Sequence, residues 1–152
     1  AELSGKKVLT EQQIRVKVMA ETDRLRQDVK ESIQKVINQR AENKLIGAQE
    51  KKTLREIKQL EQAWWVATSE YNRNFAQAEL ASRQGMLTDQ MQKKVAAERN
   101  QIVKLTKKLE AELAMLKRIA SVYDSDIGKI LGYIKAVSEA LPLNIGVGLL
   151  KK

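Results

Sequence analysis

Apolar residues recur at alternating steps of three and four along most of the chain, a spacing that predicts long amphipathic α-helices. The clearest stripe runs from Met91 to Leu141, and its acidic members are Glu98 and Glu112. Such a stripe is typical of a helix that packs along its length against other helices. Its members are Met91, Val95, Glu98, Ile102, Leu105, Leu109, Glu112, Leu116, Ile119, Tyr123, Ile127, Ile130, Ile134, Val137 and Leu141.

Thr10 and Gln13 form a capping box, which predicts the start of a first helix over residues 10–46. Gly47 then predicts a break, because glycine readily adopts the left-handed conformation that ends helices. A helix that continues through Gly47 is the alternative, since an interior glycine costs only about 1 kcal/mol. The inward positions of this helix are Ile14, Val18, Thr22, Leu25, Val29, Ile33, Val36 and Ile37.

Two further long helices are predicted over residues 48–84 and 88–121, with Thr88 or Asp89 as the N-cap of the later one. The phase of the apolar stripe continues past residue 121, so one helix could reach Leu141. We favour a break between Ser121 and Ser125 and a C-terminal helix over 125–141, which Pro142 ends. The stripe of the 48–84 helix is Leu54, Ile57, Leu60, Trp64, Ala67, Tyr71, Ala78 and Ala81.

The composition agrees with a helical chain, because it has one proline, six aromatic residues among Trp, Tyr and Phe, and many strong helix formers. Three helices of similar length joined by short turns predict an all-α fold, an elongated antiparallel three-helix bundle of coiled-coil type. A short fourth C-terminal helix and an apolar tail over 142–152 complete it. The whole chain, 1–152, is expected to form a single helical domain.

The chain has no cysteine and no histidine, which removes thiolate and imidazole ligands and any nucleophile–histidine pair. We therefore predict no enzyme activity, no catalytic residues, no metal site and no cofactor. Glu61, Glu98 and Glu112 lie on or beside apolar stripes and could handle protons or bind cations. We favour the structural interpretation, in which they fix helix register or pair with Lys or Arg.

The net charge is +9, and the excess of Lys and Arg is spread along the chain. Lys93, Lys104, Lys107 and Lys108 lie on the 88–121 helix and could bind anions such as phosphates. No interleaved aromatic residues and no known DNA-binding motif accompany them. Nucleic acid and an anionic membrane surface, the latter contacted through the C-terminal region, are therefore the secondary candidates for a partner.

Large apolar residues also exceed what a slender bundle can cover. Trp64 and Trp65 are adjacent on a helix and point about 100° apart, so one can enter the core while the other cannot fully do so. A half-exposed tryptophan would be a good anchor for a partner, and the alternative is that both pack into an interface of three helices. The segment after residue 141 adds aliphatic residues without a polar face of its own. Fold-back onto the bundle and contact with a partner are both open for it, and we favour the partner. The predicted partner-binding residues are Trp64, Trp65, Leu141, Leu143, Ile145, Val147, Leu149 and Leu150.

These patterns favour a non-enzymatic structural or assembly protein, which acts through helix–helix contacts in a homo-oligomer or a larger machine. Long helical hairpins of this kind occur in secretion-machine components, bacteriocin domains and virion proteins, a likeness of shape alone. The alternative is a basic helical protein that docks on nucleic acid or an anionic membrane. No signal peptide or membrane-spanning stretch is visible, so the cytoplasm and an exported or virion assembly both stay open.

Overall fold

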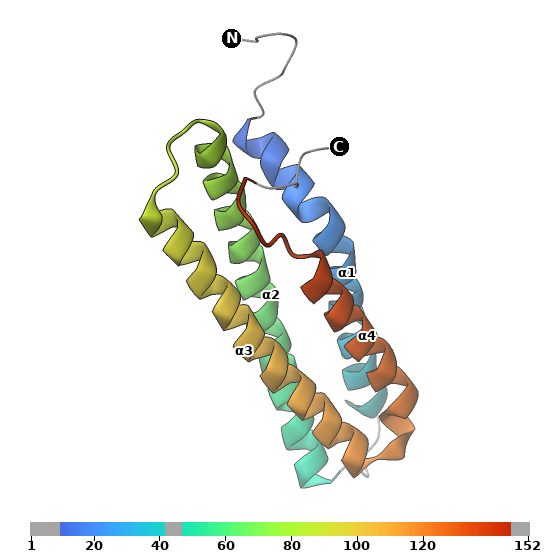
Figure 1. Cartoon of the computed structure of the whole chain (residues 1–152). Coiled ribbons are helices and arrows are strands. Elements are labelled where there is room, and N and C mark those ends of the chain that lie inside the picture. The colour runs from blue at the N-terminus through green and yellow to red at the C-terminus, as the bar shows by residue number, and fades with distance from the viewer. Residues whose placement is uncertain (1–9, 42–46, 147–152) are drawn as a thin grey trace.

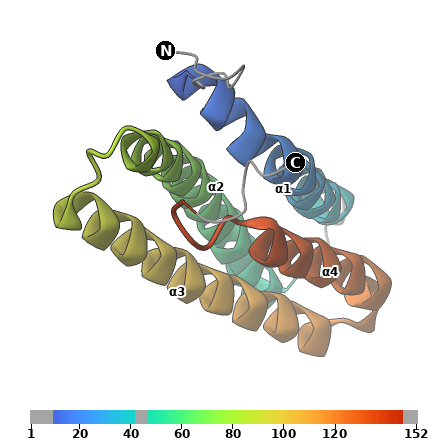
Figure 2. The same cartoon turned by 45° about the horizontal axis from the view of Figure 1, so that its top comes forward.

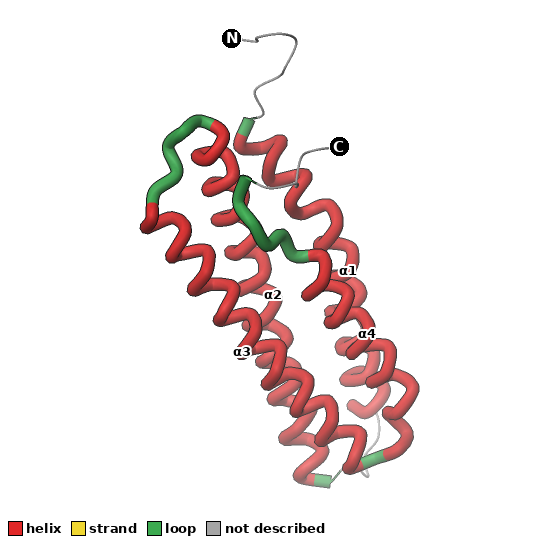
Figure 3. Tube along the Cα trace, in the orientation of Figure 1, coloured by secondary structure: helices red, strands yellow, loops and turns green. Residues whose placement is uncertain are grey.

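A computed structural model describes residues 10–41 and 47–146, apart from the side chains at positions 11, 18, 21, 40 and 41. The predictions for the side chain of Val18 and for Val147, Leu149 and Leu150 lie outside this part. Helices make up 89% of the described residues, and none of these residues forms a strand, so the all-α prediction is confirmed (Figure 3). The elements are α1 (Glu11–Ala41), α2 (Ala48–Arg83), α3 (Asp89–Ile119), the 3₁₀ turn η2 (Ser121–Tyr123) and α4 (Asp124–Ala140).

Side-chain caps mark the starts of α1 and α3. The backbone N–H of Thr10 donates to Gln13 Oε1 at 2.9 Å, and the N–H of Gln13 donates to Thr10 Oγ1 at 3.2 Å. This is the reciprocal capping box that the sequence predicts. At the start of α3 the hydroxyl oxygen of Thr88 accepts the N–H of Met91 at 3.1 Å, so Thr88 is the N-cap.

The turns between helices also have local causes. Gly85 has a φ of 70°, and the N–H of Met86 donates to the carbonyl of Ala81 at 2.7 Å, which is the Schellman geometry that ends α2. Ala120 is extended, with φ −149° and ψ 120°, and it separates α3 from η2 and α4. The helix is therefore interrupted just before the predicted break at residues 121–125.

Consecutive helices run antiparallel, and α2 packs along both α1 and α3 (Figures 1 and 2). The last helix, α4, packs mainly on α1 and makes few contacts with α3 beyond the turn that joins them. It has 17 residues, whereas α1, α2 and α3 have 31, 36 and 31. The fourth position of the bundle is therefore filled by helix over about half of its length.

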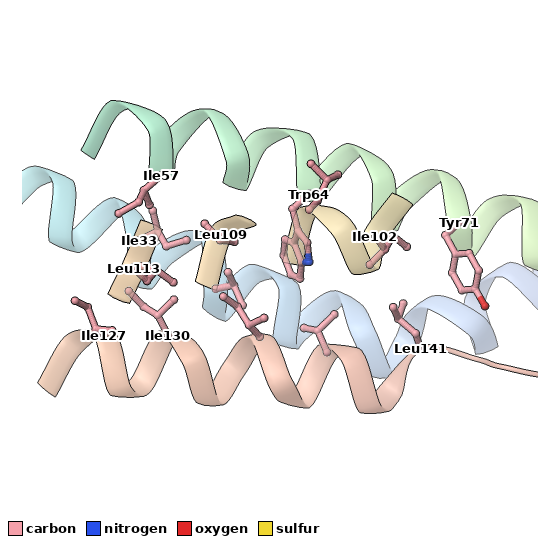
Figure 4. Packing of buried hydrophobic residues seen from close by; sticks show 14 of the residues in the cluster. Ile33, Ile57, Trp64, Tyr71, Ile102, Leu109, Leu113, Ile127, Ile130 and Leu141 are labelled. Atoms are coloured by element: carbon pink, nitrogen blue, oxygen red, sulfur yellow. The ribbon is translucent and has the colours of Figure 1, made fainter. Parts of the chain in front are cut away.

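One apolar cluster runs through the bundle and draws on all four α-helices (Figure 4). Most members of the Met91–Leu141 stripe are buried, and Met91 itself is exposed in the first turn of α3. Leu113, which the predicted stripe does not contain, is buried in place of its neighbour Glu112. The large side chains labelled in the cluster are Ile33, Ile57, Trp64, Tyr71, Ile102, Leu109, Leu113, Ile127, Ile130 and Leu141.

Candidate interaction surface

After α4 the chain does not extend into solvent but crosses toward α2 and α3. We call residues 141–146 the C-terminal strap. Arg99 Nη2 donates to Tyr71 Oη at 2.8 Å and also to the carbonyl oxygen of Leu143, while Tyr71 Oη donates to the carbonyl oxygen of Pro142. Burial raises the pKa of Tyr71, which keeps its hydroxyl a donor. One arginine and one tyrosine thus hold the beginning of the strap.

The end of the strap is held by α2. The N–H of Gly146 donates to Glu79 Oε1 at 2.7 Å, and Arg83 Nε donates to the other oxygen of this buried carboxylate at 3.1 Å. Gly146 has a φ of 81°, and a β-carbon there would lie 3.1 Å from Ser82 Oγ. Glycine is therefore the residue that fits this close, left-handed approach. The described part of the tail folds back on its own bundle, one of the two fates left open by the sequence.

A groove lies between α3 and α4. The two helices diverge from the turn that joins them (Figure 1). The volume of the groove is about 290 Å³, just below the range of about 300–1,000 Å³ that is typical of small-molecule pockets. Its apolar lining consists of the buried side chains of Ile102 and Leu141 and the exposed side chains of Val103 and Leu143. The last two are 44% and 58% exposed. Arg99, Thr106, Lys107, Glu110 and Ser138 complete the lining.

The wall of this groove also holds a polar atom without a partner. The hydroxyl oxygen of Thr106 is buried and makes no hydrogen bond with any described residue.

A second cavity of about 370 Å³ lies on the other side of Leu143, with Leu87 and Val95 in its lining. Arg99 and Leu143 belong to both cavities, so the strap divides what would otherwise be one longer groove along α3.

A polar cluster joins α1 to α2 inside the bundle. Arg26 is only 2% exposed, and its Nε donates to Thr68 Oγ1 at 2.7 Å. Its Nη2 donates to the carbonyl oxygen of Trp65 at 2.8 Å and to Ser69 Oγ, and its Nη1 donates to Asp23 Oδ1 at 2.8 Å. Because every nitrogen of the guanidinium has an acceptor, this cluster is a satisfied structural contact rather than an open site.

The two tryptophans have different surroundings. Trp64 is fully buried in the core, so it offers no surface to a partner in this fold. Trp65 is half-buried, and its ring is covered by the guanidinium of Arg26 at 4.0 Å and the ammonium of Lys30 at 5.0 Å. These cation–π contacts cover part of the ring, so less of it is free to contact a partner.

The three stripe glutamates lie in three separate places. Glu61 is 6% exposed, and burial raises its pKa against the opposing charges of Lys30 and Arg26. Glu98 is half-buried and accepts a hydrogen bond from Asn74 at 2.6 Å. Their charged or polar neighbours differ, since Glu61 is influenced by Lys30 and Arg26, Glu98 by Asn74 and Glu112 by Glu56. Burial raises the pKa of Glu98, and burial together with the charge of Glu56 raises that of Glu112.

The four lysines singled out on α3, Lys93, Lys104, Lys107 and Lys108, are all exposed. None of them forms a salt bridge with another described residue. Lys107 lines the α3–α4 groove, and Lys108 lines a separate shallow depression between α2 and α3. The structure therefore distributes them around α3, and only Lys107 belongs to the groove.

The tail residues are distributed in the same uneven way. Leu141 is buried in the core, Leu143 is exposed at the mouth of the groove, and Ile145 is half-buried against the core.

Val103 was not singled out by the sequence, because it lies off the apolar stripe of its helix. Its position four residues before Lys107 and four after Arg99, on one helical face, is the signal that could have identified it.

Within the described ranges, no cluster of Asp, Glu, His or Cys side chains is arranged to hold a metal ion. No described helix combines the length and the apolar character that a membrane crossing requires. Comparison of the chain with protein-family models, with curated proteins and with solved structures finds no match. The groove, the strap and their charged neighbours are therefore the basis for assigning a function.

Proposed function

We propose that this protein is a non-enzymatic helical assembly protein, which binds a helix of another protein chain in the groove between α3 and α4. The observation that carries this proposal is the groove itself, about 290 Å³ in volume and walled by Ile102, Val103, Leu141 and Leu143. Apolar grooves between two helices are a common receptor for the apolar face of a third helix. The short α4 supports the same idea, because its 17 residues can pair with only part of the 31-residue α3.

The absence of cysteine from the chain makes a sharp test available. A single cysteine at position 103 or 143 would carry a photo-activated crosslinker in the cells that make the protein. We expect crosslinks to a second protein chain, either another protein or a copy, from both positions. Val66 on α2 is 55% exposed and lies outside the groove, so the same substitution there is the control.

Equal crosslinking from positions 66, 103 and 143 would overturn the proposal, because it would show contact without a defined face. Light scattering at two protein concentrations separates a copy from a different protein. A mass that doubles at the higher concentration indicates self-association. A constant monomer mass together with position-specific crosslinks indicates a different protein.

A second candidate is a basic protein that docks on nucleic acid or an anionic membrane. The exposure of Lys93, Lys104, Lys107 and Lys108 without acidic partners among the described residues favours it. Binding through phosphates weakens steeply as salt rises, whereas an apolar helix contact does not. Binding to duplex DNA or to phosphatidylserine vesicles that disappears at moderate salt would support this candidate over the first.

A further inference from the structure

We infer that the occupant of the α3–α4 groove is an acidic amphipathic helix supplied by a different protein. This inference rests on the proposed function and narrows it to one class of partner. It follows from the charges along the rim and from the apolar wall.

The groove and its margins carry three exposed lysines and one half-buried acidic side chain, Glu110. Lys107 lies in the lining, and Lys117 follows Glu110 by two helical turns on the same side of α3. Across the groove, Lys135 lies one turn before Ser138 on α4. All three lysines are exposed and form no salt bridge with another described residue. Carboxylates on an incoming helix would be attracted to this rim, and ammonium groups would be repelled.

The wall supplies the apolar half of the recognition. Val103 and Leu143 are exposed large aliphatic side chains in the lining of one groove, which also contains the buried Ile102 and Leu141. Leucine-like side chains at every third or fourth position of a helix would be buried against these four residues.

Charge also argues against a second copy of this chain as the occupant. Helix α3 carries eight Lys and Arg residues against four Asp and Glu residues between Asp89 and Ile119. A symmetric pair would place two such helices beside each other, and like charges at close range are destabilising. An acidic helix from another protein avoids this repulsion.

The test uses two labelled helical peptides and the full-length chain. Both peptides carry leucine at the inward positions of a helix, and the outward positions are glutamate in one and lysine in the other. Fluorescence anisotropy at near-physiological salt measures their affinities. We expect the acidic peptide to bind and the basic one not to bind.

Two pairs of variants locate the binding. Val103→Glu should lower the affinity for the acidic peptide by more than about tenfold. Val66→Glu should leave that affinity nearly unchanged. Lys107→Glu should lower the affinity for the acidic peptide by roughly fivefold. Lys104→Glu makes the same charge change on α3 outside the groove and should lower this affinity much less. Equal losses for Lys107→Glu and Lys104→Glu would overturn the inference, because they would show attraction to net charge alone.

The remaining outcomes separate this inference from the function on which it rests. If both peptides bind and Val103→Glu blocks both, the groove binds helices and its acidic preference is wrong. If neither peptide binds, both the inference and the proposed function fail. If the intact chain doubles in mass and Val103→Glu restores the monomer, the occupant is a second copy. Phosphatidylserine vesicles provide the last comparison. If they displace the acidic peptide equally well from Val103→Glu and from the unsubstituted chain, the surface binds lipid and the inference is overturned.

Discussion

Arg99 Nη2 lies 2.8 Å from Tyr71 Oη, and both groups also bond to the backbone of the C-terminal strap. The guanidinium additionally lies over the tyrosine ring, 5.7 Å from its centroid. This pair links α2, α3 and the strap at the level where α4 ends. It occupies part of the space that a longer fourth helix would fill.

Replacing Arg99 with methionine should lower the free energy of unfolding by about 1–3 kcal/mol. The reason is that Tyr71 and two backbone carbonyls lose a charged donor at partly buried positions. Urea denaturation followed by circular dichroism measures the change. Arg118→Met, at an exposed cation of the same helix, is the control and should cost less than about 0.5 kcal/mol. A strap that is held by other contacts would show no difference between the two variants.

Leu105→Ala and Leu109→Ala should each lower the free energy of unfolding by about 2–5 kcal/mol, because both side chains are buried in the bundle. Lys107→Ala and Lys108→Ala, at exposed neighbouring positions, should change it by less than about 0.5 kcal/mol. The four variants are compared by their urea midpoints. Similar shifts at all four positions would mean that the apolar face of α3 is assigned wrongly.

Arg26→Lys should lower the free energy of unfolding by about 2–4 kcal/mol, although the charge is kept. An ammonium group cannot reproduce the planar set of donors that reaches Thr68, Ser69 and the carbonyl of Trp65 together. Thermal or urea unfolding measures the loss, and Arg24→Lys at an exposed position of α1 is the matched control. Equal stability of the two variants would show that Arg26 acts only as a positive charge.

Glu61 should make the protein less stable as the pH rises above about 4.5, the ordinary pKa of a glutamate. Burial raises the pKa of Glu61 in the folded state, so between its unfolded and folded pKa values the folded chain holds more protons. Raising the pH through that window therefore removes stability. Glu61→Gln should remove this contribution and flatten the pH profile of the urea midpoint. Glu139→Gln, at an exposed position, is the control. A profile as steep in Glu61→Gln as in the unsubstituted chain would contradict the assignment.

Periodicity could predict the helices because their buried positions repeat locally along the chain. The same local pattern could not choose between Glu112 and Leu113, which are adjacent and both near the stripe. Packing places Leu113 in the core and leaves Glu112 half-buried near Glu56. A helix of 3.6 residues per turn drifts relative to a fixed stripe, so such one-residue shifts are settled by the neighbouring helix.

Burial of Arg26 could not be predicted from its own segment, where Leu25 is the better core residue. Its acceptors come from Trp65, Thr68 and Ser69, about forty positions later in the chain. The available signal was the small polar residues that recur at helical spacing on α2, through Thr68 and Asn72. The course of the strap was hidden for the same reason, since it depends on groups from α2 and α3.

The contact between α1 and α4 has a consequence for how the chain is made. The first helix, α1, packs about equally on α2 and on α4, which is translated after α2 and α3. During translation the apolar side of α1 therefore stays uncovered until α4 has left the ribosome. Domains become able to fold as their segments emerge, from the N-terminus onward. A helical hairpin of α1 and α2, in which the apolar side of α1 still lacks α4, should accordingly be the nascent species that chaperones recognise.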